Sequence, residues 1–132
     1  MKRNLLLAGI LTMLTVISAF TAAQLTPIDQ VVTALKKGNA GELSRYFDNT
    51  IEISLPDRSD SYSRSQAEIV LKDFFDTKGV QNFTAGHKGS KNGSEYCIGV
   101  LITRSGSFRT TIYMKQKSDR QLLQELRIES SK

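Results

Sequence analysis

The fold is decided by residues 80–117, VQNFTAGHKGSKNGSEYCIGVLITRSGSFRTTIYMKQK, in which apolar and polar residues alternate with a period of two. Such alternation is typical of half-buried β-strands. It predicts strands over about 83–89, 95–103 and 108–117, and a fourth strand at about 121–129 closes the chain. We therefore expect successive antiparallel strands in the C-terminal part of the protein.

The first turn between these strands is the clearest local signal. Asn92 and Gly93 form the dipeptide that most strongly favours a two-residue hairpin. With Lys91 opposite Ser94, the register determines which residues of the first two strands face one another. The predicted opposite pairs, all on one face of the sheet, are Phe83–Ile102, Ala85–Val100 and His87–Ile98.

The second turn decides which face the third strand presents. We expect a three-residue loop at 105–107, because a two-residue loop would place Arg109 opposite Ile102 and mix the two faces. The predicted pairs are then Val100–Ile112 and Ile98–Met114, and the last strand adds Leu122, Leu126 and Ile128 to the same face. The other face is mixed, with Cys97 on it and the Tyr113 ring over Gly99.

Helical signals precede these strands. Residues 26–29, Thr-Pro-Ile-Asp, combine a capping residue, an early proline and an acid, and Gly38 ends the helix. Asn39 with Glu42 predicts a second, short helix. Alternation at 51–55 predicts a strand, with an edge strand over 58–64.

A third helix follows the edge strand. We expect Ser65 and Glu68 to form its capping box and Gly79 to stop it. Its apolar face consists of Ala67, Val70, Leu71 and Phe74, with Phe75 beside them. The expected fold class is α+β, a curved antiparallel sheet with the N-terminal helices packed on its concave face.

The N-terminus has the pattern of a secretory signal peptide. Lys2 and Arg3 precede an uncharged apolar run at 5–20, and Thr21-Ala22-Ala23 supplies a small-residue cleavage site. We therefore expect a signal peptide at 1–23, a single domain at 24–132 and an exported protein, periplasmic or secreted. The apolar run is shorter than the roughly 20 residues of a membrane span, and none is expected after the signal is removed.

Composition excludes several classes of function. The formal net charge of +5 falls to +3 without Lys2 and Arg3, and no block of five like charges occurs. A nucleic-acid partner is therefore not expected. Cys97 is the only cysteine and His87 the only histidine, so we expect no internal disulfide, no Cys/His metal site and no cofactor.

Four segments resemble a known family. They are residues 34–40 (ALKKGNA), 66–68 (QAE) together with 71–75 (LKDFF), 87–90 (HKGS) and 124–129 (QELRIE). The chain resembles exported bacterial domains of unknown function, family 4783, within the nuclear transport factor 2-like (cystatin-like) superfamily. This resemblance implies a cone-shaped fold and an export route, and it implies no activity.

His87 is the sharpest single candidate for chemistry. The predicted register aims it at the concave side, where histidine can serve as acid or base or be a packed structural residue. An isomerase or dehydratase would use it with Tyr96 or Tyr62 as hydrogen-bond donor. The candidate ligand-pocket residues on that side are Phe74, Phe83, His87, Tyr96, Ile98 and Met114.

The outer face of the sheet is the candidate partner surface. Leu101, Tyr113 and Leu123 are expected to form its apolar centre. The expected charged rim around them is Arg109, Lys115, Glu125 and Arg127. A homodimer through this face is one possibility, with Cys97 as a small apolar contact.

The sequence leaves three functions open. The first is a non-catalytic binding module for a small apolar ligand or a protein partner, which the absence of a catalytic set favours. The second is a small isomerase or dehydratase that uses His87 in the cone cavity. The third is a structural accessory domain of an envelope assembly.

Overall fold

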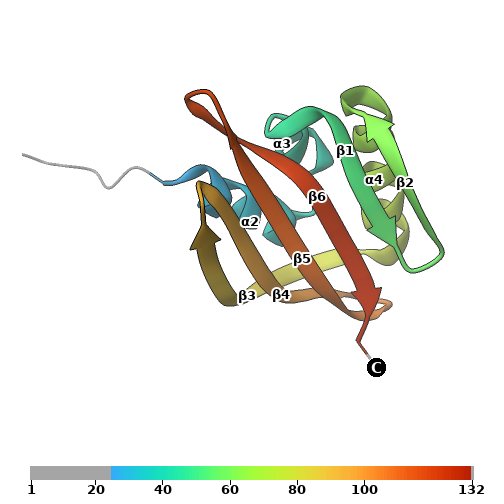
Figure 1. The fold of residues 1–132 in the computed structure, drawn as a ribbon. Coiled ribbons are helices and arrows are strands. Elements are labelled where there is room, and N and C mark those ends of the chain that lie inside the picture. The colour runs from blue at the N-terminus through green and yellow to red at the C-terminus, as the bar shows by residue number, and fades with distance from the viewer. Residues whose placement is uncertain (1–24, 132) are drawn as a thin grey trace, which may run out of the picture.

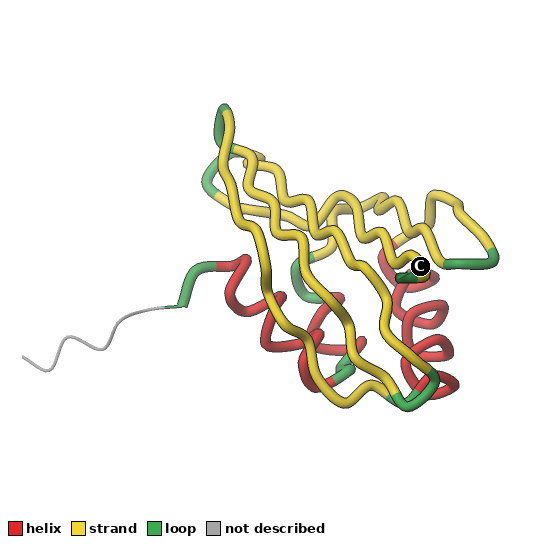
Figure 2. Tube along the Cα trace, turned by 90° about the horizontal axis from the view of Figure 1, so that it is seen from below, coloured by secondary structure: helices red, strands yellow, loops and turns green. Residues whose placement is uncertain are grey.

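The computed structural model describes residues 25–131, and the predicted signal peptide lies outside them. Three helices lie within these residues: α2 (Pro27–Lys37), α3 (Ala40–Ser44) and α4 (Arg64–Lys78). The six strands are β1 (Phe47–Leu55), β2 (Arg58–Ser63), β3 (Val80–Lys91), β4 (Ser94–Thr103), β5 (Gly106–Lys117) and β6 (Arg120–Ser130). They form one sheet in the order β2-β1-β6-β5-β4-β3. The sheet curves over the helices, which all lie on one face (Figures 1 and 2).

The expected α+β class is confirmed, and the sheet is mixed. Four of the five pairs of neighbouring strands are antiparallel, as predicted, but β1 pairs with β6 in parallel. The parallel pair joins the first strand of the chain to the last one. The chain reaches from one to the other through α4 and the whole β3–β5 meander (Figure 1).

Helix caps agree with the sequence in two of three cases. Thr26 accepts a hydrogen bond from the Asp29 amide, and Asn39 accepts one from the Glu42 amide. The third cap is two residues earlier than predicted. Ser63, the last residue of β2, accepts the Gln66 amide and caps α4, so Ser65 lies inside the helix.

The β3–β4 register is right near the turn and wrong beyond it. Lys91 faces Ser94 and His87 faces Ile98, as predicted. The register then slips by one residue at Gly86, so that Phe83 faces Leu101 instead of Ile102. The slip is a β-bulge, an extra unpaired residue in one strand. A Cβ atom on Gly86 would lie 2.9 Å from the main-chain oxygen of Ile98.

The β4–β5 turn is also shorter than predicted. Thr103 faces Gly106, which leaves a two-residue turn, 104–105. The Thr103 hydroxyl closes this turn by donating to the Gly106 carbonyl (2.7 Å) and accepting from the Ser105 amide (3.1 Å). Val100 consequently faces Arg109 instead of Ile112, and Ile98 faces Thr111 instead of Met114.

These two shifts invert the faces of β4. Cys97 and Leu101 are buried in the core, while the alternate residues of β4 turn away from the helices. The residues of β4 that turn away are Tyr96, Ile98, Val100 and Ile102. A further bulge, at Gln124 in β6, puts Leu123 into the core and leaves Leu122 outside it.

The core between helices and sheet is filled. Predicted inward residues Ile112, Leu126 and Ile128 are fully buried, so this part of the pattern is confirmed. From α4, Phe74 packs edge-to-face on Phe108 of β5, with ring centroids 5.6 Å apart. The remaining large, fully buried side chains of this layer include Phe47, Leu35, Leu43, Ile51, Leu71 and Phe83.

Candidate functional site

The six candidate pocket residues do not share one cavity. Phe74, Phe83 and Met114 belong to the filled core, with exposed fractions of 7, 1 and 0%. The other three candidates, His87, Tyr96 and Ile98, lie on the opposite face of the sheet. The prediction put all six on one side because it included neither the Gly86 bulge nor the two-residue turn at 104–105.

The predicted partner patch is divided in the same way. Leu101 and Leu123 are fully buried under the helices, and only Tyr113 remains on the outer face. Cys97 is buried as well, and this burial raises the pKa of its thiol. A buried thiol with a raised pKa is a poor nucleophile.

A stripe of apolar side chains runs along the outer face of β4. We call Tyr96, Ile98, Val100 and Ile102 the β4 stripe. Val100 is 38% exposed, the largest exposed fraction among the apolar residues of the described strands. Because none of the helices within residues 25–131 covers this face (Figure 2), the described part of the chain leaves the stripe open to a ligand or a partner.

The stripe forms one wall of a groove, which we call the outer groove. Its volume is about 640 Å³, and its apolar part consists of Ile98 and Val100. Gly86 and Gly99 contribute only main chain to it, which keeps the surface low there. The groove continues across β5 and β6, where its charged residues are Arg109 and Glu129. This volume lies within the range of roughly 300–1,000 Å³ that is common for small-molecule sites.

His87 and Tyr96 are hydrogen-bonded at one end of the outer groove. The Tyr96 hydroxyl lies 3.0 Å from His87 Nε2, and both side chains are on the face of the sheet opposite the described helices. Tyr96 reaches His87 because its ring crosses Gly89, the residue opposite it on β3. A side chain at position 89 would collide with the ring, since a Cβ there would lie 2.4 Å from it.

Charged groups occupy the other end of the outer groove. Arg109 on β5 faces Glu129 on β6 across the ladder. Glu129 lies 3.9 Å from Arg127, and Arg127 also contacts Glu125 at 2.8 Å. Within residues 25–131, no carboxylate oxygen is within 4.0 Å of the Arg109 guanidinium. Within the described residues, Arg109 therefore has a positive charge without an ion-pair partner, beside an apolar surface.

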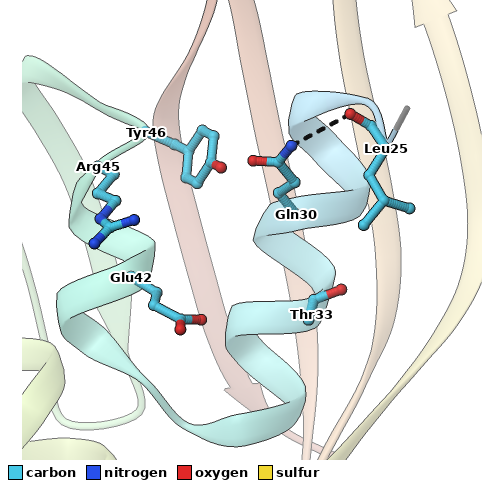
Figure 3. Close-up of a pocket in the computed structure, with 6 residues that line it drawn as sticks. All are labelled: Leu25, Gln30, Thr33, Glu42, Arg45 and Tyr46. Atoms are coloured by element: carbon cyan, nitrogen blue, oxygen red, sulfur yellow. Dashed lines mark hydrogen bonds between the residues drawn. The ribbon is translucent and has the colours of Figure 1, made fainter. Parts of the chain in front are cut away.

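A second, smaller pocket lies between α2 and α3 (Figure 3). Its volume is about 190 Å³, and Tyr46 lies opposite Gln30 across it. Glu42, Arg45 and Thr33 complete its polar surround. This volume is below the range of common small-molecule sites, so the outer groove is the stronger candidate.

Two general features of the described residues bear on the chemistry of the site. No group of three or more His, Cys, Asp or Glu side chains in this part of the chain could hold a metal ion. Within the same residues, no helix is both long and apolar enough to cross a membrane.

Sequence comparison identifies the family. The family model for a domain of unknown function, DUF4783, matches residues 28–129. The chain belongs to the DUF4783 family. A search of the curated proteins finds no match.

Solved structures agree with this assignment. A DUF4783 protein from Bacteroides fragilis is 34% identical, with a TM-score of 0.73 over 77% of this chain and 96% of that chain. A DUF4783 protein from Bacteroides ovatus is 29% identical, with a TM-score of 0.75 over 78% and 94%. An NTF2-like protein of unknown function from Cytophaga hutchinsonii is 8% identical, with a TM-score of 0.57 over 80% and 90%. These likenesses confirm the predicted family and the NTF2-like fold.

Three groove residues of this DUF4783 chain were missed by the sequence reasoning. Val100 was assigned to the wrong face, Arg109 was taken as a rim residue of the partner patch, and Glu129 was not considered. One signal could have found them: a two-residue turn at 104–105 brings Phe108 opposite Leu101, so that two large apolar residues meet in the core. No comparable signal in the sequence locates the Gly86 bulge.

Proposed function

We propose that this DUF4783 protein is an exported, non-catalytic binding module, and that its ligand site is the outer groove. The observation that carries the proposal is the uncovered apolar surface of Ile98 and Val100 in a groove of about 640 Å³. The filled core supports it too, because Phe74, Phe83 and Met114 occupy the layer where a cone cavity would lie.

The ligand suited to this groove is small and partly apolar. Ile98 and Val100 offer an aliphatic surface, while His87, Arg109 and Glu129 offer polar contacts around it. Such a combination of apolar surface and a few polar groups is typical of small-molecule sites. Burying Val100 under a ligand would remove its exposed apolar area from water, at about 25 cal/mol per Å².

The experiment is a ligand titration followed by amide chemical shifts. We expect small aliphatic molecules, with octan-1-ol as the first probe, to shift amides in β3–β6 around Gly86, Gly99 and Val100. Val100→Lys should weaken binding at least tenfold, because it puts a charge on the apolar surface. Ile69→Lys is the matched control, since Ile69 is 67% exposed on α4, on the other side of the protein.

A protein partner on the same face is the other form of this proposal. The β4 stripe could pack against a partner, including a second copy of the chain, and such packing would cover the outer groove. Sedimentation distinguishes the two forms. A larger particle that Val100→Lys reduces to the monomer would support a protein contact, and a monomer that binds octan-1-ol would support a ligand site.

An enzyme that uses His87 is the second candidate function. The 3.0 Å contact between His87 Nε2 and the Tyr96 hydroxyl favours it, because an acid or base needs a partner that orients it. His87→Gln and Tyr96→Phe should then each abolish turnover of an isomerase or dehydratase substrate. Unchanged turnover in both variants would exclude this function for the pair.

A further inference from the structure

We propose that the ligand of the outer groove is an amphipathic carboxylate, and that Arg109 binds its carboxylate group. This inference rests on the proposed ligand-binding function and specifies the chemistry of the ligand. It follows from the free charge of Arg109, from the apolar surface beside it and from the arrangement of the neighbouring charges.

The neighbouring charges leave Arg109 available. Glu129 is directly opposite Arg109 on β6, where it could form a cross-strand ion pair. Instead, Glu129 lies near Arg127 (3.9 Å) on its own strand, and no carboxylate of the described residues is within 4.0 Å of Arg109. The ion pairs of Arg127 with Glu125 and Glu129 therefore run along β6, and no carboxylate of residues 25–131 pairs with Arg109 on β5.

The apolar surface lies next to this free guanidinium. Val100 is directly opposite Arg109 on β4, and Ile98 is the next outward residue along the same strand. A hydrocarbon chain resting on these two side chains would have one end at Arg109. A guanidinium binds carboxylates through two parallel hydrogen bonds, and desolvation by the apolar chain strengthens such contacts.

The end of the groove that holds His87 is placed to contact the part of the ligand that is farthest from its carboxylate. His87 lies on β3, one strand beyond β4 and one outward position along from Val100, and its partner Tyr96 lies on β4, two outward positions from Val100. Strands are about 4.8 Å apart and residues about 3.4 Å apart along each strand, so the Cα atoms of Arg109 and His87 are on the order of 12 Å apart. A ligand of this length can reach from the guanidinium to the hydrogen-bonded pair.

The test compares three probes with the same eight-carbon chain: octanoate, octan-1-ol and octylammonium. We expect octanoate to bind about tenfold more tightly than octan-1-ol, and octylammonium more weakly than either, in amide-shift titrations at fixed ionic strength. Arg109→Gln should remove the preference for octanoate and leave the affinity for octan-1-ol unchanged.

The matched control is Lys115→Gln. Lys115 is exposed on the outer face of the same strand, nearer the hairpin tip, and its removal changes the net charge equally. It should leave octanoate binding unchanged. Arg109→Lys should restore only part of the preference, because an ammonium group lacks the paired donors of a guanidinium.

The possible outcomes separate this inference from the function on which it rests. If none of the three probes binds, the proposed ligand site itself is wrong. If octanoate and octan-1-ol bind equally, or if Lys115→Gln weakens octanoate as much as Arg109→Gln does, the ligand site stands and Arg109 is not its carboxylate-binding residue. Native amide spectra of each variant establish that the fold is intact.

Discussion

The contact of Tyr96 with Gly89 is a residue-scale feature on which the candidate site depends. The tyrosine ring lies over the glycine, and its hydroxyl is 3.0 Å from His87 Nε2. Glycine here serves as a space for an aromatic ring across the strand. Any side chain at position 89 must move the ring, and the hydrogen bond to His87 must then break.

We expect Gly89→Ala and Gly99→Ala to have different effects. In Gly89→Ala the obstacle is the far end of the Tyr96 side chain, which can swing away, so unfolding stability should fall by less than about 1 kcal/mol. In Gly99→Ala the new Cβ would lie 2.4 Å from the main-chain oxygen of Thr84, and the loss should be about 3 kcal/mol. Urea unfolding measures both.

A separate measurement follows the hydrogen bond in the Gly89 variant. The imidazole NMR signals of His87 should move in Gly89→Ala as they do in Tyr96→Phe. His87 signals in Gly89→Ala that match those of the wild type would show that the Tyr96–His87 hydrogen bond does not depend on a glycine at position 89.

At the scale of elements, the sequence prediction and the structure differ in the residue that caps the start of α4. The sequence favours Ser65 as the helix cap, whereas the structure has Ser63, with extended backbone angles, accepting the Gln66 amide. We expect Ser63→Ala to reduce stability by about 1 kcal/mol and Ser65→Ala to change it by less than 0.5 kcal/mol, roughly the limit for neutral surface substitutions. A larger loss of stability for Ser65→Ala than for Ser63→Ala in urea unfolding would support Ser65 as the cap and contradict Ser63.

A buried carboxylate of β1 adds side-chain contacts with the β5–β6 hairpin to the β1–β6 ladder. Asp48 is 5% exposed, accepts from Lys117 at 2.7 Å and accepts from Gln124 at 3.0 Å. The hydrogen bond from Lys117 holds the pKa of Asp48 below its ordinary value of 3.8. The hairpin projects past the rest of the sheet (Figure 1), and this contact holds it near its turn, because Lys117 is the last residue of β5.

We expect Asp48→Asn to lower the free energy of unfolding by about 2 kcal/mol at neutral pH, because it removes a hydrogen bond to a charged group. The pKa of Asp48 is lower in the folded than in the unfolded chain. The ionised carboxylate therefore stabilises the fold above pH 3.8, and this contribution disappears as the pH falls through the folded pKa.

The Asp48→Asn variant has no carboxylate at this position, so it lacks this pH dependence of the unfolding free energy. The stability difference between wild type and Asp48→Asn should therefore shrink below pH 4 in urea unfolding at a series of pH values. A difference that stayed constant down to pH 2 would show that the carboxylate charge contributes nothing.

Elements were predictable from the sequence, and their faces were only partly so. Periodicity and turn residues located every described helix and strand, because an element of five or more residues averages over many weak preferences. Which face each strand presents depends on single residues. One bulge at Gly86 and a turn one residue shorter than expected moved Ile98 and Val100 to the outside, and the candidate site moved with them.

At the scale of the whole molecule, export is the prediction that most affects function. Residues 1–23 carry the signal pattern, and we expect the chain isolated from outside the cytoplasm of an expressing bacterium to begin at Gln24. Intact-mass measurement of the periplasmic and cytoplasmic fractions tests this directly. Full-length chain confined to the cytoplasm would contradict it, and Ala23→Pro should block cleavage if the site is right.

The parallel pairing of β1 with β6 also determines when the chain can fold. Glu52 meets Glu125, and Ile53 meets Leu126, so β1 lacks its central neighbour until more than half of the protein has followed it. At a synthesis rate of about 5–20 residues per second, β1 remains without β6 for several seconds. A nascent chain of this topology cannot complete its sheet before its last strand has been synthesised. Until then the chain stays incompletely folded and able to pass through a narrow translocation channel, so the sheet is completed late, after synthesis.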